Sequence, residues 1–386
     1  MALDQETLNQ LLDTVGRFVE ERLKPAEAKV AADDSIPADI IGEMRELGLF
    51  GLSIPEEYGG LGLTMSEEVQ VAFRLGGTSP VFRSLIGTNN GIGSQGIVMD
   101  GTEQQKSTWL PRLAAGVIIG SFCLTEPDVG SDAGSLRTLA AKDGDDYVIT
   151  GTKRFITNAP EAGLFTVFAR ADRDSRDARG VTAFLVEADT RGISLGRNDH
   201  KMGQRGAHTC DVIFDGVRVP ADNIIGGPAK LGQGFKTAMK VLDRGRLHIS
   251  SVCVGIAERL ISDSLRYAME RKQFGQPIAE FQLIQAMLAD MKAESFAARC
   301  MVEETARRKD AGANVSTEAA CCKMFASEMV GRVADKAVQI YGGAGYIADY
   351  GVERFYRDVR LFRIYEGTTQ IQQLVIARNM IKAAAA

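Results

Sequence analysis

The residues best suited to chemistry lie near the C-terminus, in the run IYEGTTQIQ at 364–372. Glu366 stands there between an aromatic residue and Gly367. Burial disfavours the charged form of a carboxylate and raises its pKa, which is the adjustment that a general base needs near neutral pH. Gly367 allows a substrate to approach the backbone closely, and Thr368 offers a ligand a hydrogen bond. The run also fits an ordinary helix start, with Thr368 or Thr369 as N-cap and the carboxylate on a solvated turn.

Two polar loops elsewhere in the chain suit a flat or phosphorylated ligand. The first, FCLTEPDVGSD at 122–132, combines a stiff proline, a glycine and short polar side chains, so it would present free N–H and O–H groups. A plain linker between domains is the alternative interpretation. The second, GTKRFITNA at 151–159, carries Phe155, which is suited either to stacking on a flat cofactor or to the core of a sheet.

Three further motifs follow in the C-terminal part. In DRGR at 243–246, Arg246 suits a phosphate or an adenine and Asp243 a hydroxyl or amide, although an ion network on a helix surface fits equally. In RKQFGQPI at 271–278 a helix is expected to end at the glycine and restart after the proline, which leaves Arg271 free for a diphosphate. The glycines of QIYGGAGY at 339–346 allow close approach, but the spacing is not that of a Rossmann loop.

These motifs must be positioned by three stretches of different periodicity. Apolar residues recur at helical spacing up to about residue 120, short β-rich runs separated by turns follow, and long amphipathic segments return from about Gly232. We expect helices at about 38–49, 65–76 and 84–99, with earlier and later ones around Leu8 to Val19 and from Thr102. The β-rich part predicts an antiparallel sheet folded as a barrel or sandwich. Long helices are expected at about 235–271, 279–309 and 316–342.

The domain boundaries follow from these changes. We predict an N-terminal α-helical domain over 1–120, a middle β domain over 121–230 and a C-terminal helical bundle over 231–386. The fold class is therefore a multidomain protein with separate α and β domains.

Composition narrows the function. A net charge of -5 gives no reason to expect a nucleic-acid partner. The 3 histidines are scattered, so no sequence-local metal site is expected, and the 6 cysteines lack CxxC spacing and are interpreted as reduced thiols. No signal peptide or apolar run of transmembrane length is visible, so we expect a cytoplasmic protein without membrane association.

From Phe122 to Gln372 the order and spacing of these motifs resemble those of the acyl-CoA dehydrogenases, and the resemblance covers nearly the whole chain. It implies FAD, a helical–β–helical subunit with a C-terminal four-helix bundle, and a homotetramer. It also implies an oxidoreductase of fatty acid metabolism that desaturates an acyl-CoA to a trans-2-enoyl-CoA and passes electrons to an electron-transfer flavoprotein. The run IYEGTTQIQ looks most like the short- and medium-chain enzymes.

Carried over by position, the resemblance assigns roles to individual residues. Glu366 matches the catalytic base, its N–H and a flavin hydroxyl would hold the thioester oxygen, and the β-hydride would pass to FAD. Phe155 stands where the family has a tryptophan, so stacking should survive while the indole N–H is lost. Substrate contacts are implied for Ser131, Asp243, Arg244, Arg246 and Gly367. FAD contacts are implied for Phe122, Leu124, Thr125, Ser131, Phe155, Ile156, Thr157, Thr368, Thr369 and Gln370. Contacts to the FAD of a neighbouring subunit are implied for Arg271, Phe274, Gln282, Gln339, Ile340, Tyr341, Gly342 and Gly343.

The acyl group is the open part of this interpretation. Arg83, in VFRS, is similar to the arginine that pairs with the distal carboxylate in glutaryl-CoA dehydrogenases, so an acyl-CoA with a distal anion is the alternative substrate. A solvated arginine near a helix start is the plain alternative. Rival members of the same family are oxidases, DNA-binding proteins and flavin monooxygenases. The length of the chain argues against an oxidase, its acidic net charge argues against a DNA-binding protein, and the presence of Glu366 argues against a flavin monooxygenase.

Overall fold

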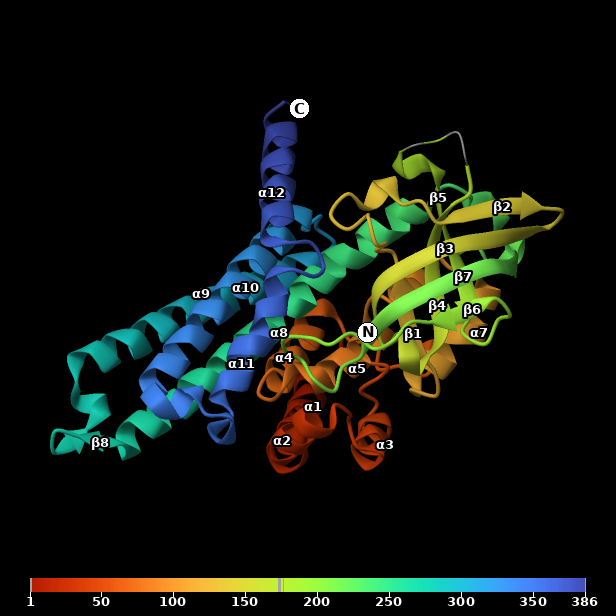
Figure 1. The fold of residues 1–386 in the computed structure, drawn as a ribbon. Helices are drawn as coiled ribbons and strands as arrows, with labels where there is room; N and C mark the ends of the chain where they lie inside the picture. Colours follow the sequence, from red (N-terminus) through yellow and green to blue (C-terminus); the bar gives the residue numbers. More distant parts are fainter. Residues whose placement is uncertain (1, 173–174, 176, 386) are drawn as a thin grey trace.

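The N-terminal part is helical, as its periodicity predicts. The computed structural model describes residues 2–172, 175 and 177–385 (Figure 1). The N-terminal helices are α1 (Gln5–Phe18), a π-helical turn (Val19–Leu23), α2 (Lys24–Asp33), α3 (Ala38–Glu46), α4 (Met65–Leu75), α5 (Pro80–Asn90), α6 (Gln95–Asp100) and α7 (Glu103–Ala114). Thr102 caps α7 in a capping box with Gln105, as its place before the helix suggests.

Two helix boundaries differ from the prediction. The helix expected around Leu8 to Val19 does not end there but continues through the π-helical turn into α2, because Pro25 in the first turn of α2 occupies a position whose N–H has no partner inside a helix. The single helix expected at 84–99 is two helices: α5 begins earlier, at Pro80, and the chain breaks at Gly91 before α6.

The middle part is one curled sheet of seven strands. They are β1 (Ile119–Cys123), β2 (Leu139–Asp143), β3 (Asp146–Thr157), β4 (Ala162–Arg170), β5 (Val181–Glu187), β6 (Ile193–Leu195) and β7 (Thr209–Pro220). The order is β1-β4-β2-β3-β7-β6, with β5 paired to β4. The sheet is mixed rather than purely antiparallel, because β1 lies parallel to β4 and brings the chain from the N-terminal helices into the sheet.

The C-terminal part is helical again, as predicted. Its helices are α8 (Gly234–Glu270), α9 (Gln282–Asp310), α10 (Ser316–Tyr341), α11 (Val352–Val359) and α12 (Thr369–Ala384). The three long helices pack on one another, and α11 and α12 pack against α10. Helix α8 ends at Glu270, in agreement with the predicted segment of about 235–271. The glycine at which a helix end was also expected lies instead in a two-strand hairpin, β8 (Lys272–Gln273) and β9 (Gln276–Pro277), that occupies this connection.

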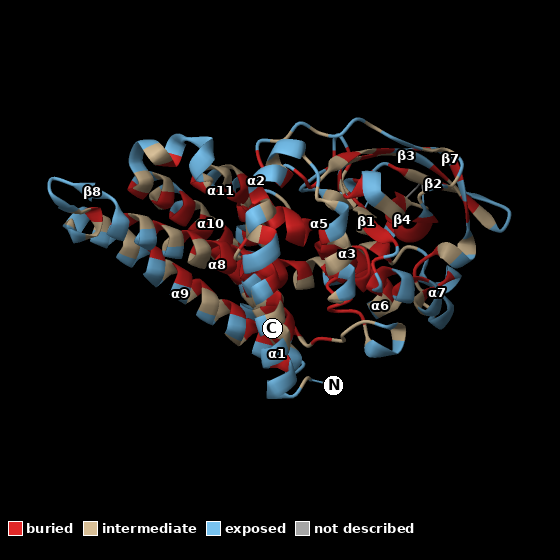
Figure 2. Ribbon diagram, turned by 90° about the horizontal axis from the view of Figure 1, so that it is seen from below, coloured by how far each residue is buried: buried red, intermediate tan, exposed pale blue. Residues whose placement is uncertain are grey.

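Helix α5 joins the three parts. It lies between the sheet and the long helices, and all of its residues are buried (Figures 1 and 2). The end of β3 is fastened to it by Asn158, whose Nδ2 donates to Ser84 O at 3.0 Å and to Thr88 Oγ1 at 2.9 Å. Within the described residues, no helix combines the length and apolarity needed to cross a bilayer.

Candidate active site

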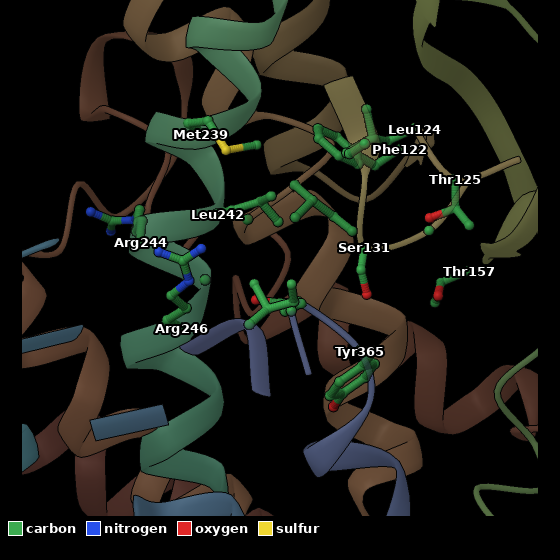
Figure 3. Close-up of a pocket in the computed structure, with 18 of the residues that line it drawn as sticks. Phe122, Leu124, Thr125, Ser131, Thr157, Met239, Leu242, Arg244, Arg246 and Tyr365 are labelled. Carbon is green, nitrogen blue, oxygen red and sulfur yellow. The ribbon is translucent and has the colours of Figure 1, made fainter. Parts of the chain in front are cut away.

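A cavity of about 890 Å³ opens where α5, α8, the sheet and the loop before α12 meet. Figure 3 shows Thr125, Ser131 and Thr157 on one side of it and Arg244 and Arg246, from α8, on the other. One wall of the cavity is therefore rich in hydroxyls and the opposite wall in cations. The lining also includes Glu68, Arg83, Phe122, Leu124, Phe155, Ile156, His248, Tyr365, Glu366 and Gly367.

The loop that carries Glu366 has an unusual backbone. Glu366 has φ 53° and Gly367 φ 87°, so two successive residues adopt the left-handed region, which glycine tolerates and glutamate does not favour. Thr368 caps α12 by accepting a hydrogen bond from Ile371 N at 3.2 Å. The helix start that the sequence offered as an alternative is therefore real. It coexists with a carboxylate turned into the cavity rather than onto a solvated surface.

The environment of Glu366 raises its pKa. Its Oε2 is shielded from solvent and has no hydrogen-bond partner among the described residues. Burial raises the pKa of the carboxyl, and the charges of Arg83, Lys323 and Arg246 oppose that rise only in part. A carboxylate with an orphaned oxygen at a cavity wall is suited to accept a proton from a bound molecule.

A cluster of charged side chains forms part of the cavity wall beside α5. His248 Nδ1 lies 2.7 Å from Glu68 Oε1, and Arg244 donates to the other oxygen of Glu68. Burial, together with the positive charge of Arg83, lowers the pKa of His248. Arg83 itself is 8% exposed, and no described residue forms a hydrogen bond or ion pair with its side chain. The interpretation of Arg83 as a solvated side chain is therefore wrong.

Arg246 and Asp243 form the ion pair that the sequence suggested, but not on an open surface. The two side chains are joined directly, one turn apart on α8, and Arg246 is 6% exposed. Arg246 lines the cavity, while Asp243 lies behind it, where it also accepts from Ser316 Oγ at 3.4 Å. Asp243 is thus placed to orient Arg246 rather than to line the cavity.

The opposite wall of the cavity is aromatic and rich in hydroxyls. Phe155 is 58% exposed because the register between β3 and β7 shifts between Lys153 and Ile156 and turns its ring outward, with φ 57°. The loop at 122–132 is held in place by buried Glu126, which accepts from Lys153 Nζ and Thr138 N, each at 2.8 Å. This loop is therefore an ordered part of the site and not a plain linker.

Several predicted residues lie away from this cavity. Arg271, Phe274, Ile340, Tyr341, Gly342 and Gly343 line a second hollow at the β8–β9 end of the helices, while Gln282 and Gln339 line neither. Thr368, Thr369 and Gln370 do not line the cavity either. The Thr369 hydroxyl donates to Glu328 Oε1 at 2.7 Å, because the first turn of α12 directs it toward α10, and Gln370 is exposed.

No site role was predicted from the sequence for four residues at or beside the cavity: Glu68, His248, Lys323 and Gln372. A signal existed for Lys323, because it falls at helical spacing among Ala319, Ala326 and Val330, which are buried. A lone cation in such an apolar stripe indicates a buried partner. Glu68 and His248 come from helices far apart in the sequence, so no local pattern joins them.

Comparison with known proteins agrees with this architecture. Family models described as the N-terminal, middle and C-terminal domains of acyl-CoA dehydrogenase match residues 5–117, 121–217 and 232–381. The chain belongs to the acyl-CoA dehydrogenase family. It is 39% identical to the CarC subunit of the caffeyl-CoA reductase–Etf complex of Acetobacterium woodii, over 97% of this chain and 98% of that one.

Solved structures of acyl-CoA dehydrogenases have the same fold. Butyryl-CoA dehydrogenase from Megasphaera elsdenii superposes with a TM-score of 0.93 at 34% identity, over 99% of each chain. A glutaryl-coenzyme A dehydrogenase in complex with glutaryl-CoA gives 0.92 at 32% identity, over 99% of this chain and 96% of the other. The expected helical–β–helical fold class is thereby confirmed.

Acyl-CoA dehydrogenases are FAD-dependent oxidoreductases, and the cavity fits the flavin end of FAD. The outward ring of Phe155 and the apolar Leu124 suit the face of a flat heterocycle, and the hydroxyls of Thr125, Ser131 and Thr157 suit its polar edge. No group of three or more described His, Cys, Asp or Glu side chains is arranged to hold a metal ion.

Proposed function

We propose that this acyl-CoA dehydrogenase catalyses the α,β-desaturation of an acyl-CoA thioester to the trans-2-enoyl-CoA, with Glu366 as the base for the α-proton. One observation carries the proposal: Glu366 Oε2 is a solvent-shielded carboxylate oxygen with no hydrogen-bond partner among the described residues, and it lies in the wall of a cavity that also has a face suited to a flavin. A base in such a place is strong enough to take a proton that water would not remove.

Different residues of the chain would carry out the separate parts of this reaction. Glu366 accepts the proton at Oε2. Its backbone N–H, which the family resemblance assigns to the thioester oxygen, would donate to that oxygen as charge develops there. Arg246 supplies a cation at the same wall. FAD, when bound, supplies the acceptor for the β-hydride. The wall with Phe155 would hold the flavin on the side opposite the base.

Oligomerisation and electron transfer complete the proposal. The second hollow, with Arg271 and Tyr341, is remote from Glu366 and suits the phosphate and adenine end of the FAD of a neighbouring subunit. We therefore infer a homo-oligomer, with a tetramer as the form expected from the resemblance. An electron-transfer flavoprotein is the inferred acceptor, in line with the relative that forms an Etf complex.

Glu366→Gln tests the assignment of the base. The variant should retain FAD, because Glu366 lies in a loop and the amide has the same shape, but should lose nearly all turnover of butyryl-CoA with an artificial acceptor. Flavin absorbance and steady-state rates give the two readouts. Glu303→Gln, which removes a partner of Arg299 on the outer face of α9, is the control and should retain wild-type rates. Substantial turnover by the Glu366→Gln enzyme would mean that another group is the base.

A second candidate substrate is an acyl-CoA with a distal anion. A guanidinium that is buried without an ion-pair partner is unfavourable, so an anionic group from the substrate would stabilise it. Within the part of the chain that the structure describes, Arg83 is such a guanidinium, and it lines the cavity that also holds Glu366.

A further inference from the structure

Lys323 of α10 contacts the loop that carries Glu366. Its side chain is fully buried, and its Nζ donates to Gly367 O at 2.6 Å. A buried ammonium is costly unless it is hydrogen-bonded and faces a negative charge. The carboxylate of Glu366, in the residue before Gly367, supplies a negative charge that acts on Lys323, although the two side chains form no ion pair among the described contacts.

A second buried side chain holds the same loop. Gln372, which is 0% exposed, donates from Nε2 to Glu366 O and to Gly367 O, each at 3.1 Å. These two carbonyls belong to the two successive residues with positive φ. The left-handed conformation is unfavourable for a glutamate, so it needs external support. Lys323 and Gln372 provide it through hydrogen bonds to these backbone carbonyls, so Oε2 of the Glu366 carboxylate is not used to hold the loop.

We propose that Lys323 is a positioning residue for the proposed dehydrogenation: it fixes the Gly367 carbonyl, and with it the direction of the Glu366 side chain, and it brings a buried positive charge to the loop that carries the base. Gln372 supplies the hydrogen-bonding part of this clamp without the charge. The inference rests on the proposed function of Glu366 as the base.

The electrostatic surroundings agree with the proposal. Burial lowers the pKa of Lys323 to about 8, and the negative charge of Glu366 limits that fall, so the ammonium form predominates at neutral pH. The other groups that act on Lys323 are Cys253 and Arg246 from α8 and Glu328 from its own helix. The charge of Lys323 lowers the pKa of Glu366. Removing that charge should therefore raise the pKa of the base.

The test is the pH profile of kcat/KM for butyryl-CoA in three variants. Lys323→Met should lower kcat/KM at neutral pH by about tenfold or more and move the acid limb of the profile to higher pH by about one unit. Lys323→Arg retains the charge and should leave the acid limb in place. Gln372→Met should slow the reaction without moving that limb. Lys336→Met, on the same helix but paired with Asp290 on the outside, is the control and should match the wild type.

The outcomes separate two failures. A purely structural lysine would lower the activity of Lys323→Met equally at every pH, and an unmoved acid limb would overturn the proposal. An acid limb moved equally in Lys323→Arg would also overturn it, since the charge is then irrelevant. If the Glu366→Gln enzyme remains active, Glu366 is not the base, and the role of Lys323 is rejected with it. If the Glu366→Gln enzyme is inactive and the acid limb of the Lys323→Met profile is unmoved, Glu366 remains the base and only the positioning role of Lys323 is rejected. Retained flavin absorbance establishes that each variant is folded.

Discussion

A Cβ atom on Gly245 would lie 2.3 Å from Oε2 of Glu366. Two heavy atoms do not approach so closely, so glycine at this position of α8 makes the space in which the carboxylate lies. Its neighbours Arg244 and Arg246 line the same cavity. Helix α8 thus supplies two cations and, between them, a gap for the base.

Gly245→Ala should displace the carboxylate of Glu366. A shift of about 1 Å from the productive position costs roughly a hundredfold in rate, so kcat/KM should fall by one to two orders of magnitude while FAD remains bound. Steady-state kinetics and flavin absorbance measure the two effects. Gly42→Ala, in α3 with open space around its Cβ position, is the matched helical control and should leave the rate unchanged. Wild-type kinetics in the Gly245→Ala enzyme would show that the carboxylate does not act from this position.

Arg83→Met should change substrate preference rather than chemistry. If the guanidinium receives a distal carboxylate, the ratio of glutaryl-CoA to butyryl-CoA turnover should fall by about tenfold or more, because a charge-assisted hydrogen bond is lost. The ratio is the informative measurement, since Arg83 also influences the pKa of Glu366 and would affect both substrates. Arg22→Met, which removes an exposed ion pair with Glu43, is the control. An unchanged ratio would remove Arg83 from recognition of the acyl group.

Asp358 predicts a pH dependence of stability. Burial raises the pKa of this α11 carboxyl to about 6, above its value of 3.8 in an exposed setting. The folded state therefore binds a proton that the unfolded state has lost, and stability falls as pH rises from about 4 to about 6, by roughly 3 kcal/mol for two pKa units. Asp358→Asn retains the acceptor for the Gln204 N–H and should remove this fall.

Denaturant unfolding at pH 5 and pH 8 checks the Asp358 prediction. The wild type should lose more stability between pH 5 and pH 8 than the Asp358→Asn variant does. Asp335→Asn, on the exposed side of α10, should behave as the wild type does. Equal pH dependence in the wild type and Asp358→Asn would mean that Asp358 is ionised in the folded state throughout this range.

Much of the fold could be derived from periodicity. Helical spacing around Leu8, the capping box at Thr102 and the turn signals of the β-rich part are local features, and local features are what a sequence displays directly. The break at Gly91 was missed because a glycine inside a helical pattern does not by itself end a helix. The parallel pairing of β1 with β4 was missed because strand partners are chosen by packing over long sequence distances.

The sequence by itself determined which chemical groups are available: the carboxylate of Glu366 beside a glycine, the guanidinium of Arg83 near a helix start and the aromatic ring of Phe155 in a polar loop. Only the tertiary structure decided their use. It buried Arg83 with no ion-pair partner among the described residues and turned Phe155 outward through a register shift. It also joined Lys323 to the Gly367 carbonyl and packed Gly245 against the Glu366 carboxylate. The reason is physical. Residue types set which interactions are possible, but desolvation, pKa and orphaned polar atoms depend on neighbours contributed by distant segments, and these meet only when the chain has folded.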